Sequence, residues 1–291
     1  MKVLFVGIGS IGTRHLRNLH TVAAERGIQL DVTALRSSPR PLPEDVAALI
    51  NNQIMALDDT VYDLAFITNP TTLHYNALKD LKGKSKFFFI EKPIFEDSIY
   101  DIDELGLTDE NAYVACPMRY CGAYMKLKEI LKDEKPFSVR IICSSYLPGW
   151  RPTQDYRKNY SAIKALGGGV TIDLIHELDY MTDLFGFPAE SYNFKGTYSN
   201  LEIDSDDLSV YIARYQDKLC EVHLDYFGRE SRRTCEVFVA DGTVINCNEE
   251  ANMRFVREMR NVLDIMAGKA ENINTPTKAN KVLALTLGKE A

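Results

Sequence analysis

The chain has 291 residues, of which 45% are hydrophobic and 26% charged, and its formal net charge is −7. These proportions are typical of a globular protein and exclude a disordered or collagen-like chain. The acidic balance and the lack of a Lys/Arg run argue against nucleic-acid binding. The conspicuous apolar stretch FFFI at 87–90 is far too short to span a membrane.

The cysteines favour a reducing compartment, and we expect the cytoplasm. There are six, at positions 116, 121, 143, 220, 235 and 247, and none forms a CxxC pair. Three alternate with apolar residues inside strand-like runs, which is typical of small buried thiols. Their even number leaves disulfides open. The sequence also begins directly with a strand-like run rather than with a secretory leader.

The first part of the chain alternates between apolar runs and helical patterns. Strands are predicted at 3–7, 31–35, 63–68, 86–90 and 112–116, and helices at 11–25, 44–51, 71–81 and 98–105. Nearly continuous apolar strands that alternate with helices predict a doubly wound parallel sheet covered on both faces. This α/β pattern ends near residue 118, so we predict a dinucleotide-binding domain at 1–118.

The first strand runs directly into a glycine-rich turn, GIGSIG at 7–12, and then into a helix. Glycines in this context allow a tight turn and let backbone N–H groups approach a pyrophosphate at the helix N-terminus. The strand before it and the helix after it make this motif more specific than a bare GxGxxG. Gly7, Gly9, Ser10, Ile11 and Gly12 are therefore the candidate dinucleotide-binding residues.

The end of the second strand bears on the choice of cofactor. Asp31 lies at about the expected count for a ribose-binding acid, but it opens the strand and so belongs at the wrong end of the sheet. The strand closes at Leu35 and is followed by Arg36 and Ser37, whose guanidinium and hydroxyl suit a 2′-phosphate. We therefore expect NADP(H) in preference to NAD(H). Stacking of Arg36 on adenine would leave that preference open.

The strand at 86–90 ends in Glu91-Lys92-Pro93. The carboxyl ends of parallel strands are where doubly wound sheets bind ligands. The proline restricts Lys92 to an extended backbone, so its ammonium group is aimed. Lys92 is a candidate to touch substrate, although a lysine before a proline is by itself usually a surface residue.

The second part of the chain changes character. A helix at about 121–133 and a strand at 137–146 lead to an irregular polar segment, and a helix follows GGG at 167–169. Consecutive strands are then predicted at 191–198, 208–215, 219–227, 234–240 and 244–247, with hairpin turns at Gln216-Asp217 and Asp241-Gly242, and helices near 251–267 and 276–288. We predict a second, α+β domain at 119–291 with an antiparallel or mixed sheet packed on helices.

The segment GGGVTIDLIHELDY at 167–180 resembles an amphipathic helix. On a helical wheel, Asp173, His176, Tyr180 and Asp183 share one side, opposite an apolar side. A solvated polar face is the simplest interpretation. His176 and Asp179, at i and i+3, could chelate a metal, but no second histidine and no HExxH or CxxC motif accompanies them, so no metal is expected.

Four stretches together resemble the Gfo/Idh/MocA oxidoreductase family: GIGSIG at 7–12, TNPTTLH at 68–74, EKP at 91–93 and GGGVTIDLIHELDY at 167–180. The resemblance implies an open sheet in the second domain and substrates that are sugars, cyclitols or nucleotide sugars. It implies that Lys92, Asp173 and His176 line the reaction site. Asp173 and His176 are three residues apart, whereas many members separate them by four. The stretch at 150–162 resembles a subgroup associated with surface-polysaccharide sugar biosynthesis.

The chemistry of alcohol oxidation assigns roles to these candidates. The ordinary pKa of histidine suits exchange of the hydroxyl proton near neutrality, so His176 would be the base, Asp173 would orient it or hold a hydroxyl, and Lys92 would stabilise charge on the oxygen. The glycines would let substrate or nicotinamide approach the backbone. Lys92 and His176 are expected to meet beside one nicotinamide. The remaining candidates are Asn69, Pro70, His74 and Glu91 for the cofactor, and Tyr120, Arg151, Asp155, Tyr156, Arg157 and Tyr160 for the substrate. For His74 and the substrate candidates an ordinary helix-start or surface position is about equally compatible.

The sequence therefore predicts an NAD(P)-dependent dehydrogenase or reductase that acts on CH–OH groups of small sugar-type substrates. Two alternatives are an NAD-dependent glycosidase or lyase and a non-catalytic sensor on the same fold. The histidine motif of such glycosidases does not match this helix, and a sensor would be expected to lose Lys92 or His176. No nucleic-acid or membrane partner is expected, and a homodimer or homotetramer is plausible.

Overall fold

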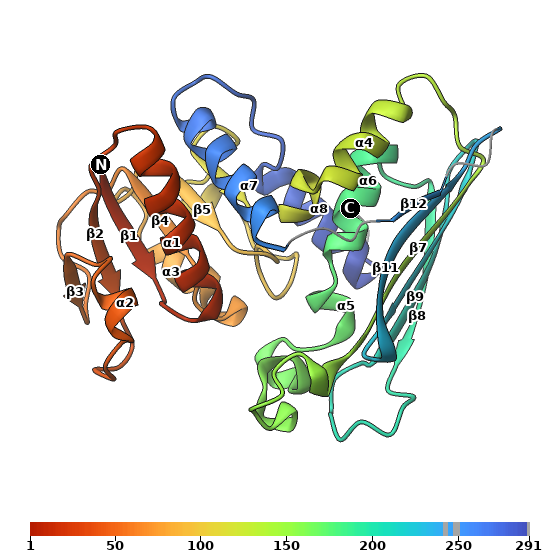
Figure 1. Ribbon diagram of the computed structural model, residues 1–291, viewed down its shortest axis with the longest axis horizontal. Coiled ribbons are helices and arrows are strands. Elements are labelled where there is room, and N and C mark those ends of the chain that lie inside the picture. Colours follow the sequence, from red (N-terminus) through yellow and green to blue (C-terminus); the bar gives the residue numbers. More distant parts are fainter. Residues whose placement is uncertain (241–243, 247–250, 290–291) are drawn as a thin grey trace. The chain divides into compact units, whose positions relative to one another are not determined.

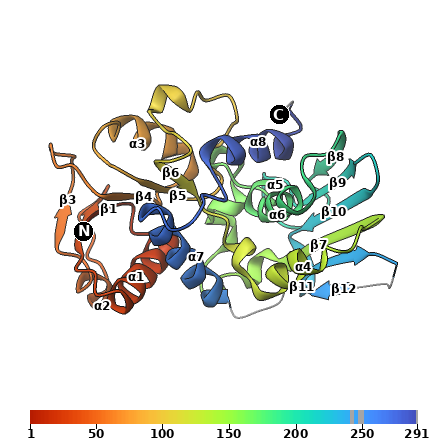
Figure 2. The same cartoon turned by 90° about the horizontal axis from the view of Figure 1, so that it is seen from above.

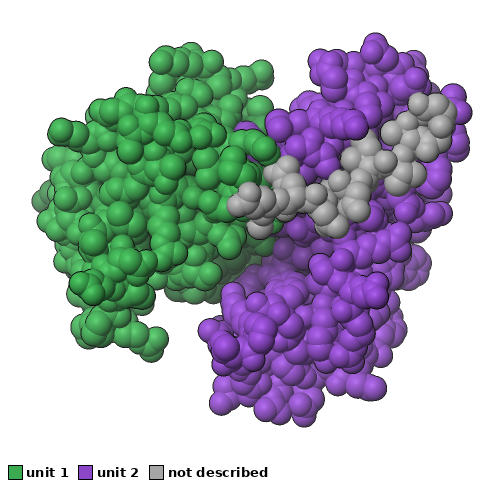
Figure 3. Space-filling view, viewed as in Figure 1, with its two compact units in different colours: residues 1–117, 252–280 green, residues 118–251, 281–291 purple. Residues whose placement is uncertain are grey.

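The computed structural model describes residues 1–240, 244–246 and 251–289. The predicted turn Asp241-Gly242 and Cys247 lie outside these residues. The chain forms two compact units, one of residues 1–117 and 252–280 and the other of residues 118–251 and 281–291 (Figure 3). The domains predicted from the sequence, at 1–118 and 119–291, did not assign residues 252–280 to the first unit.

The first unit is a six-stranded parallel sheet with strand order β3-β2-β1-β4-β5-β6. In Figure 2, α1 and α7 lie on one side of this sheet and α3 on the other. The predicted doubly wound sheet is confirmed. Its elements are β1 (Lys2–Val6), α1 (Ser10–Glu25), β2 (Asp31–Leu35), α2 (Glu44–Ala47), β3 (Asn52–Ile54), β4 (Leu64–Ile67), α3 (His74–Asp80), β5 (Phe88–Ile90), β6 (Ala112–Val114) and α7 (Ala251–Met266).

The core of the first unit is built from the apolar strands that the sequence pattern indicated. Phe5 of β1 stacks on Phe66 of β4 with ring centroids 4.3 Å apart, and Phe66 in turn contacts Phe89 of β5. Helix α7 is tied to α1 by Arg260, which donates to Glu25, and by Arg26, which donates to Asp264. These long-range ion pairs bring the late helix back to the first sheet.

Some local predictions in the first unit need correction. The predicted helix at 98–105 is only a 3₁₀ turn, Asp103–Leu105, and the helix at 44–51 is reduced to α2. The strand β3 was not predicted, because NQI has no apolar alternation. Short elements of this kind are fixed by pairing with a neighbour, here β2, rather than by their own sequence.

The second unit is a six-stranded mixed sheet with order β12-β11-β7-β10-β9-β8, packed on helices (Figure 1). The pair β7–β10 is parallel and the other pairs are antiparallel, so the predicted open, mostly antiparallel sheet is confirmed. Its elements are α4 (Gly122–Ile130), β7 (Ser138–Tyr146), α5 (Val170–Asp173), α6 (His176–Phe185), β8 (Glu190–Gly196), β9 (Leu208–Arg214), β10 (Leu219–Asp225), β11 (Phe227–Phe238), β12 (Val244–Asn246) and the part of α8 (Pro276–Leu287) that follows residue 280.

Every second residue of the strand predicted at 219–227 lies on the buried face of this sheet. Cys220, Val222, Leu224 and Tyr226 are all buried. The irregular segment between β7 and α5 consists of short 3₁₀ turns at Leu147–Gly149, Tyr156–Lys158, Tyr160–Ala162 and Lys164–Leu166. The five cysteines within the described residues are free and buried. None of the helices described has the length and apolar character that crossing a membrane would require.

Candidate active site

The turn between β1 and α1 has the shape that a dinucleotide needs. At Gly12 a Cβ atom would lie 2.5 Å from the carbonyl oxygen of Gly7, so only glycine lets the helix pack this closely on the strand. At Gly9 a Cβ would meet nothing within 4 Å, which leaves the backbone open to a ligand. No side chain caps the start of α1, where Ser10 and Ile11 begin the helix. A pyrophosphate fits such an N-terminus, because its backbone N–H groups favour an anion.

The residues after β2 lie at the carboxyl end of the sheet, as expected. Asp31 is the first residue of β2 and pairs with Lys2, so its carboxylate is at the opposite end of the strand. Arg36 follows the last residue of β2; its Nη1 donates to Oε1 of Gln53 at 2.7 Å and its Nη2 to the carbonyl oxygen of Arg40. Ser37 is exposed beside it. The guanidinium is therefore held at the position that the sequence predicted for the cofactor ribose.

The turn after β4 brings two of its three predicted cofactor residues to the surface. Asn69 is half-buried and Pro70 is exposed, whereas His74 is buried. The two ring nitrogens of His74 lie 3.0 Å from the carbonyl oxygens of Ile94 and Asn69, and burial lowers the pKa of this histidine below its ordinary value. His74 therefore lies between two backbone segments, and in its neutral form it can donate to only one of the two carbonyl oxygens.

Glu91 belongs to a buried polar pair that the sequence analysis missed. Nε2 of His15 lies 2.5 Å from Oε1 of Glu91, and the backbone N–H of Lys92 donates to Oε2 at 3.0 Å. Burial by itself raises the pKa of Glu91, but His15 and Lys92 more than offset this and hold it below its ordinary value. The signal was present in the sequence: His15 falls on the same face of α1 as Leu16 and Leu19. A titratable residue on a buried helical face predicts a buried partner.

Lys92 directly follows this carboxylate at the end of β5. The peptide bond between Lys92 and Pro93 is cis, Pro93 is buried, and the lysine is half-buried. An ammonium group fixed at the carboxyl end of a parallel strand can stabilise negative charge that develops on a substrate oxygen.

In the second unit, Asp173 and His176 lie on two successive short helices rather than on one. Helix α5 ends at Asp173, α6 begins at His176, and Leu174 (φ −100°, ψ 27°) interrupts them. The single continuous helix predicted for this segment is therefore wrong. Asp173 accepts a hydrogen bond from the Tyr226 hydroxyl at 2.6 Å. Burial, followed by the charge of Asp173, raises the pKa of Tyr226, so this hydroxyl stays a donor.

The glycines before α5 pack against the protein's own chain. A Cβ at Gly168 would lie 2.1 Å from the carbonyl oxygen of Tyr160, and one at Gly169 (φ +131°) would lie 2.4 Å from Oδ1 of Asp206. Asp206 in turn accepts from the backbone N–H and hydroxyl of Thr171. The expected role of these glycines, to admit substrate to the backbone, is corrected: close packing of the loop on α5 already requires them.

The carboxylates of α6 have buried side chains, which contradicts the solvated face that the sequence suggested, whereas His176 at the start of the helix is half-buried. Arg119 donates from Nε and Nη2 to both oxygens of Asp179, at 2.9 and 2.7 Å, and from Nη1 to Asp183 at 2.7 Å. Glu177 has 0% exposure and forms an ion pair with Arg233, in which the arginine Nε lies 2.8 Å from the glutamate Oε1. No local pattern predicted these pairs, because the arginines lie about 60 residues away in either direction.

Five predicted substrate residues lie on the irregular segment, where two of them contact a neighbouring loop and two others pair within the segment. Arg157 pairs with Asp155 and with Glu202, and the hydroxyl of Tyr156 accepts from the backbone N–H of Glu202. Arg151 donates to Asn159. Tyr160 is half-buried. These contacts hold the segment in one conformation and leave its role toward substrate a prediction.

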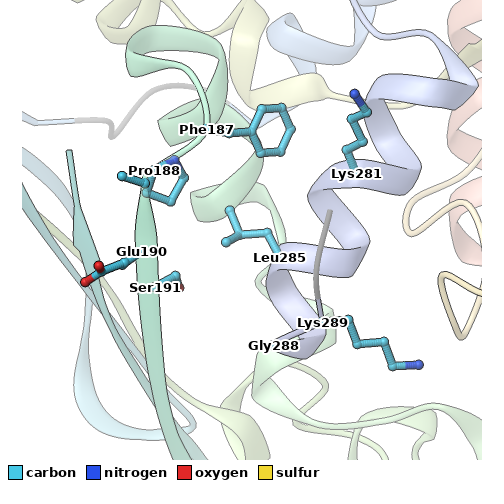
Figure 4. Close-up of a pocket in the computed structure, with 9 residues that line it drawn as sticks. Phe187, Pro188, Glu190, Ser191, Lys281, Leu285, Gly288 and Lys289 are labelled. Atoms are coloured by element: carbon cyan, nitrogen blue, oxygen red, sulfur yellow. The ribbon is translucent and has the colours of Figure 1, made fainter. Parts of the chain in front are cut away.

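The sixth predicted substrate residue, Tyr120, is buried at the end of the 3₁₀ turn that precedes α4. Separately, a cavity of about 640 Å³ lies beside α8 and the start of β8, where Leu285 faces Glu190 and Ser191 (Figure 4). None of the residues proposed from the sequence lines it. The described residues include no group of three or more His, Cys, Asp or Glu side chains placed to hold a metal ion.

Comparison with known proteins supports the resemblance found in the sequence. Residues 1–120 match the model of the GFO_IDH_MocA family, described as an oxidoreductase family with an NAD-binding Rossmann fold. The matched residues include the glycine-rich turn, the turn after β4 and the EKP motif. No curated protein matches the chain significantly.

Solved structures share the fold over nearly the whole chain. They include myo-inositol 2-dehydrogenase from Lactobacillus plantarum (18% identity, 99% of this chain and 98% of that chain, TM-score 0.78). A levoglucosan dehydrogenase in complex with NADH and levoglucosan has 15% identity over 98% and 95% of the chains, with a TM-score of 0.82. The WlbA dehydrogenase from Bordetella pertussis, in complex with NADH and UDP-GlcNAcA, has 14% identity over 99% and 93%, with a TM-score of 0.79. At such identities the likeness establishes the fold of both units.

Proposed function

We propose, from the membership of residues 1–120 in the Gfo/Idh/MocA oxidoreductase family, that the whole chain is a nicotinamide-dependent oxidoreductase. Its substrate is a secondary hydroxyl or the corresponding keto group on a sugar, cyclitol or nucleotide sugar. The single observation that carries this proposal is the conjunction in one unit of an open dinucleotide turn at Gly9 and a lysine at the carboxyl end of β5. The titles of the structural neighbours, which name sugar and nucleotide-sugar dehydrogenases, support the substrate class.

Gly7, Gly9 and Gly12 with the start of α1 would hold the dinucleotide pyrophosphate, and Arg36 with Ser37 the adenosine ribose. Bound nicotinamide supplies the hydride acceptor for alcohol oxidation, or the donor in reverse. Asn69, Pro70, His74 and Glu91 form or support the strand ends that face this ligand.

The chain's own residues supply the remaining chemistry. His176 takes the hydroxyl proton as general base, and Asp173, oriented by the Tyr226 hydroxyl, holds a substrate hydroxyl or His176. Lys92 stabilises the charge that forms on the oxygen once the proton has left. Tyr120, Arg151, Asp155, Tyr156, Arg157 and Tyr160 are the proposed substrate-contacting residues.

Replacement of Lys92 or His176 tests this assignment. We expect Lys92→Met and His176→Ala each to lower kcat by about 10²–10⁴-fold, because each removes a group that acts on the reacting oxygen or its proton. The measurement is nicotinamide absorbance with panels of nucleotide sugars, uronic acids and keto sugars. Cofactor affinity, followed by quenching of NADPH fluorescence, should change little.

Lys195→Met and His20→Ala are matched controls, because Lys195 lies on β8 and His20 on α1, and neither is a proposed site residue. Full activity in both Lys92→Met and His176→Ala would rule out the proposed catalytic groups. Ligand binding without turnover on any substrate in the panels would instead favour a sensor.

We also propose that NADP(H) is preferred over NAD(H). The support is Arg36, whose guanidinium is held by Gln53 and Arg40 at the end of β2. Arg36→Asp should move the ratio of NADPH to NADH affinity by at least about tenfold toward NADH, because it replaces a phosphate-binding cation by an acceptor for ribose hydroxyls. Arg17→Asp, an exposed change on α1, is the control. An unaltered ratio in Arg36→Asp would show that Arg36 does not select the cofactor.

The remaining proposals concern the compartment, the assembly state and the partners of the enzyme. We propose a cytoplasmic homodimer or homotetramer without nucleic-acid or membrane partners, supported by the five free, buried thiols and the acidic net charge. Analytical ultracentrifugation of the purified chain measures the assembly state directly.

A further inference from the structure

We propose that a hollow in the second unit binds the base and diphosphate of a nucleotide-linked sugar; this inference rests on the proposed dehydrogenase function. The hollow has a volume of about 430 Å³. Its walls carry four aromatic side chains and one cation: Tyr146, Tyr156, Tyr198, Phe227 and Arg229. They come from the end of β7, the segment before α5, the loop after β8 and the start of β11, which meet at one end of the sheet (Figure 1).

A β-bulge forms one wall. Strand β11 pairs with β7 at Phe227↔Tyr146 and resumes only at Arg232↔Ser144, so four residues of β11 oppose one of β7. This bulge places the Arg229 guanidinium over the Tyr146 ring, 3.9 Å from its centroid. Bulges commonly redirect a side chain next to a binding site.

Two buried carboxylates fix the walls in advance of any ligand. Asp225 accepts from the backbone N–H groups of Phe227 and Gly228, at 3.1 and 2.8 Å, and so holds the start of the bulge. Asp207 accepts from the backbone N–H groups of Tyr198 and Ser199, at 2.7 and 2.8 Å, and so holds the opposite loop. Preorganised walls reduce the entropy lost on binding.

The lining chemistry selects the class of ligand. Bases stack on tyrosine rings and on the guanidinium planes of arginine, and a guanidinium also donates to phosphate oxygens. Among the described residues that line the hollow, Arg229 is the one that carries a charge and none has a carboxylate to accept from sugar hydroxyls. A planar anion such as a nucleoside diphosphate therefore fits this lining better than a neutral sugar.

One residue of the lining is the chain neighbour of a residue that contacts the proposed reaction site. Phe227 lines the hollow, and Tyr226, its neighbour in the chain, donates its hydroxyl to Asp173. The Trp150 ring lies edge-on to Tyr226, with centroids 5.3 Å apart. A nucleotide sugar would place its nucleoside diphosphate in the hollow and its sugar toward Asp173.

Binding of UDP and GDP to the full chain tests the inference. Isothermal titration calorimetry is performed with saturating NADPH or NADH, so that the dinucleotide site of the first unit does not take up the probe. We expect at least one of the two nucleotides to bind. Tyr198→Ala removes a stacking contact with the base and Arg229→Ala removes a contact with phosphate, so each should weaken that binding by at least about tenfold. Inorganic pyrophosphate should bind more weakly than that nucleotide.

Tyr192→Ala and Arg232→Ala are matched controls, since both residues are exposed on the same sheet and neither lines the hollow. Circular dichroism verifies that all four variants fold. The inference is overturned if neither nucleotide binds, if binding is the same in Tyr198→Ala and Arg229→Ala as in the parent, or if pyrophosphate binds as tightly as both nucleotides. Because this readout needs no turnover, it can fail while the Lys92 and His176 variants still support the proposed reaction, and the reverse.

Discussion

The two units acquire their candidate residues in different ways. In the first unit, the glycine-rich turn, Arg36, Asn69 and Lys92 each begin within two residues of the end of a parallel strand, so that short local motifs bring them to the carboxyl end of the sheet. In the second unit, the acidic residues of α6 are buried against Arg119 and Arg233, each about 60 residues away. The candidate residues of the first unit are therefore positioned by the order of the parallel strands. In the second unit, the proposed base begins a helix whose buried carboxylates need arginines from distant parts of the chain.

The largest loss of stability is expected when the arginine that neutralises the buried carboxylates of α6 is replaced. Arg119→Met leaves Asp179 and Asp183 buried without their guanidinium, so we expect a loss of about 3–5 kcal/mol in the free energy of unfolding. Urea denaturation followed by the fluorescence of Trp150, the single tryptophan, reports on the second unit. Arg214→Met, which breaks an exposed pair with Glu190, is the control and should cost less than about 1 kcal/mol. Equal effects of the two changes would remove the contrast between the units.

A smaller effect is expected at the loop that precedes α5. Gly168→Ala places a methyl group 2.1 Å from the Tyr160 carbonyl oxygen, and relief of this clash should cost about 1–3 kcal/mol. The same urea experiment measures it. Gly149→Ala is the matched control, because its methyl group would meet nothing closer than 4.0 Å. If Gly168→Ala is as stable as Gly149→Ala, the loop is not packed on α5 as described.

The smallest effect, and one that depends on pH, is expected in the first unit. Glu91→Gln keeps the shape of the side chain but removes the charge bound by His15, which should cost about 1–2 kcal/mol at neutral pH. Because the pKa of folded Glu91 lies below its unfolded value, the carboxylate stabilises the fold above the ordinary pKa of glutamate. This contribution is lost as pH falls through the folded pKa.

The parent protein should therefore lose stability more steeply than Glu91→Gln as the pH falls below about 4.5, the ordinary pKa of glutamate, toward the lower pKa of folded Glu91. Urea denaturation followed by circular dichroism at a series of pH values measures both slopes. Glu104→Gln, an exposed change in the same unit, is the control. Parallel slopes for the parent and Glu91→Gln would show that Glu91 is not held ionised by its surroundings.

A feature of the structure could be predicted from the sequence when the residues that cause it are close together in the chain. His15 could have been found, because its place on the apolar face of α1 is a local signal. The break between Asp173 and His176 could not, because the sequence from Val170 to Phe185 has a continuous helical pattern. The break at Leu174 is a feature of the tertiary structure, in which Gly168 packs on the preceding loop and Gly169 on Asp206.

The sequence by itself determined the two sheets, the dinucleotide turn and the strand-end position of Lys92, since apolar periodicity and glycine turns act within a few residues of the chain. Only the tertiary structure decided that α6 buries its charges, that residues 252–280 return to the first unit, and that the bulge of β11 aims Arg229 at Tyr146. The reason is that a charge can be buried only where a partner compensates it, and here the partners come from distant parts of the sequence.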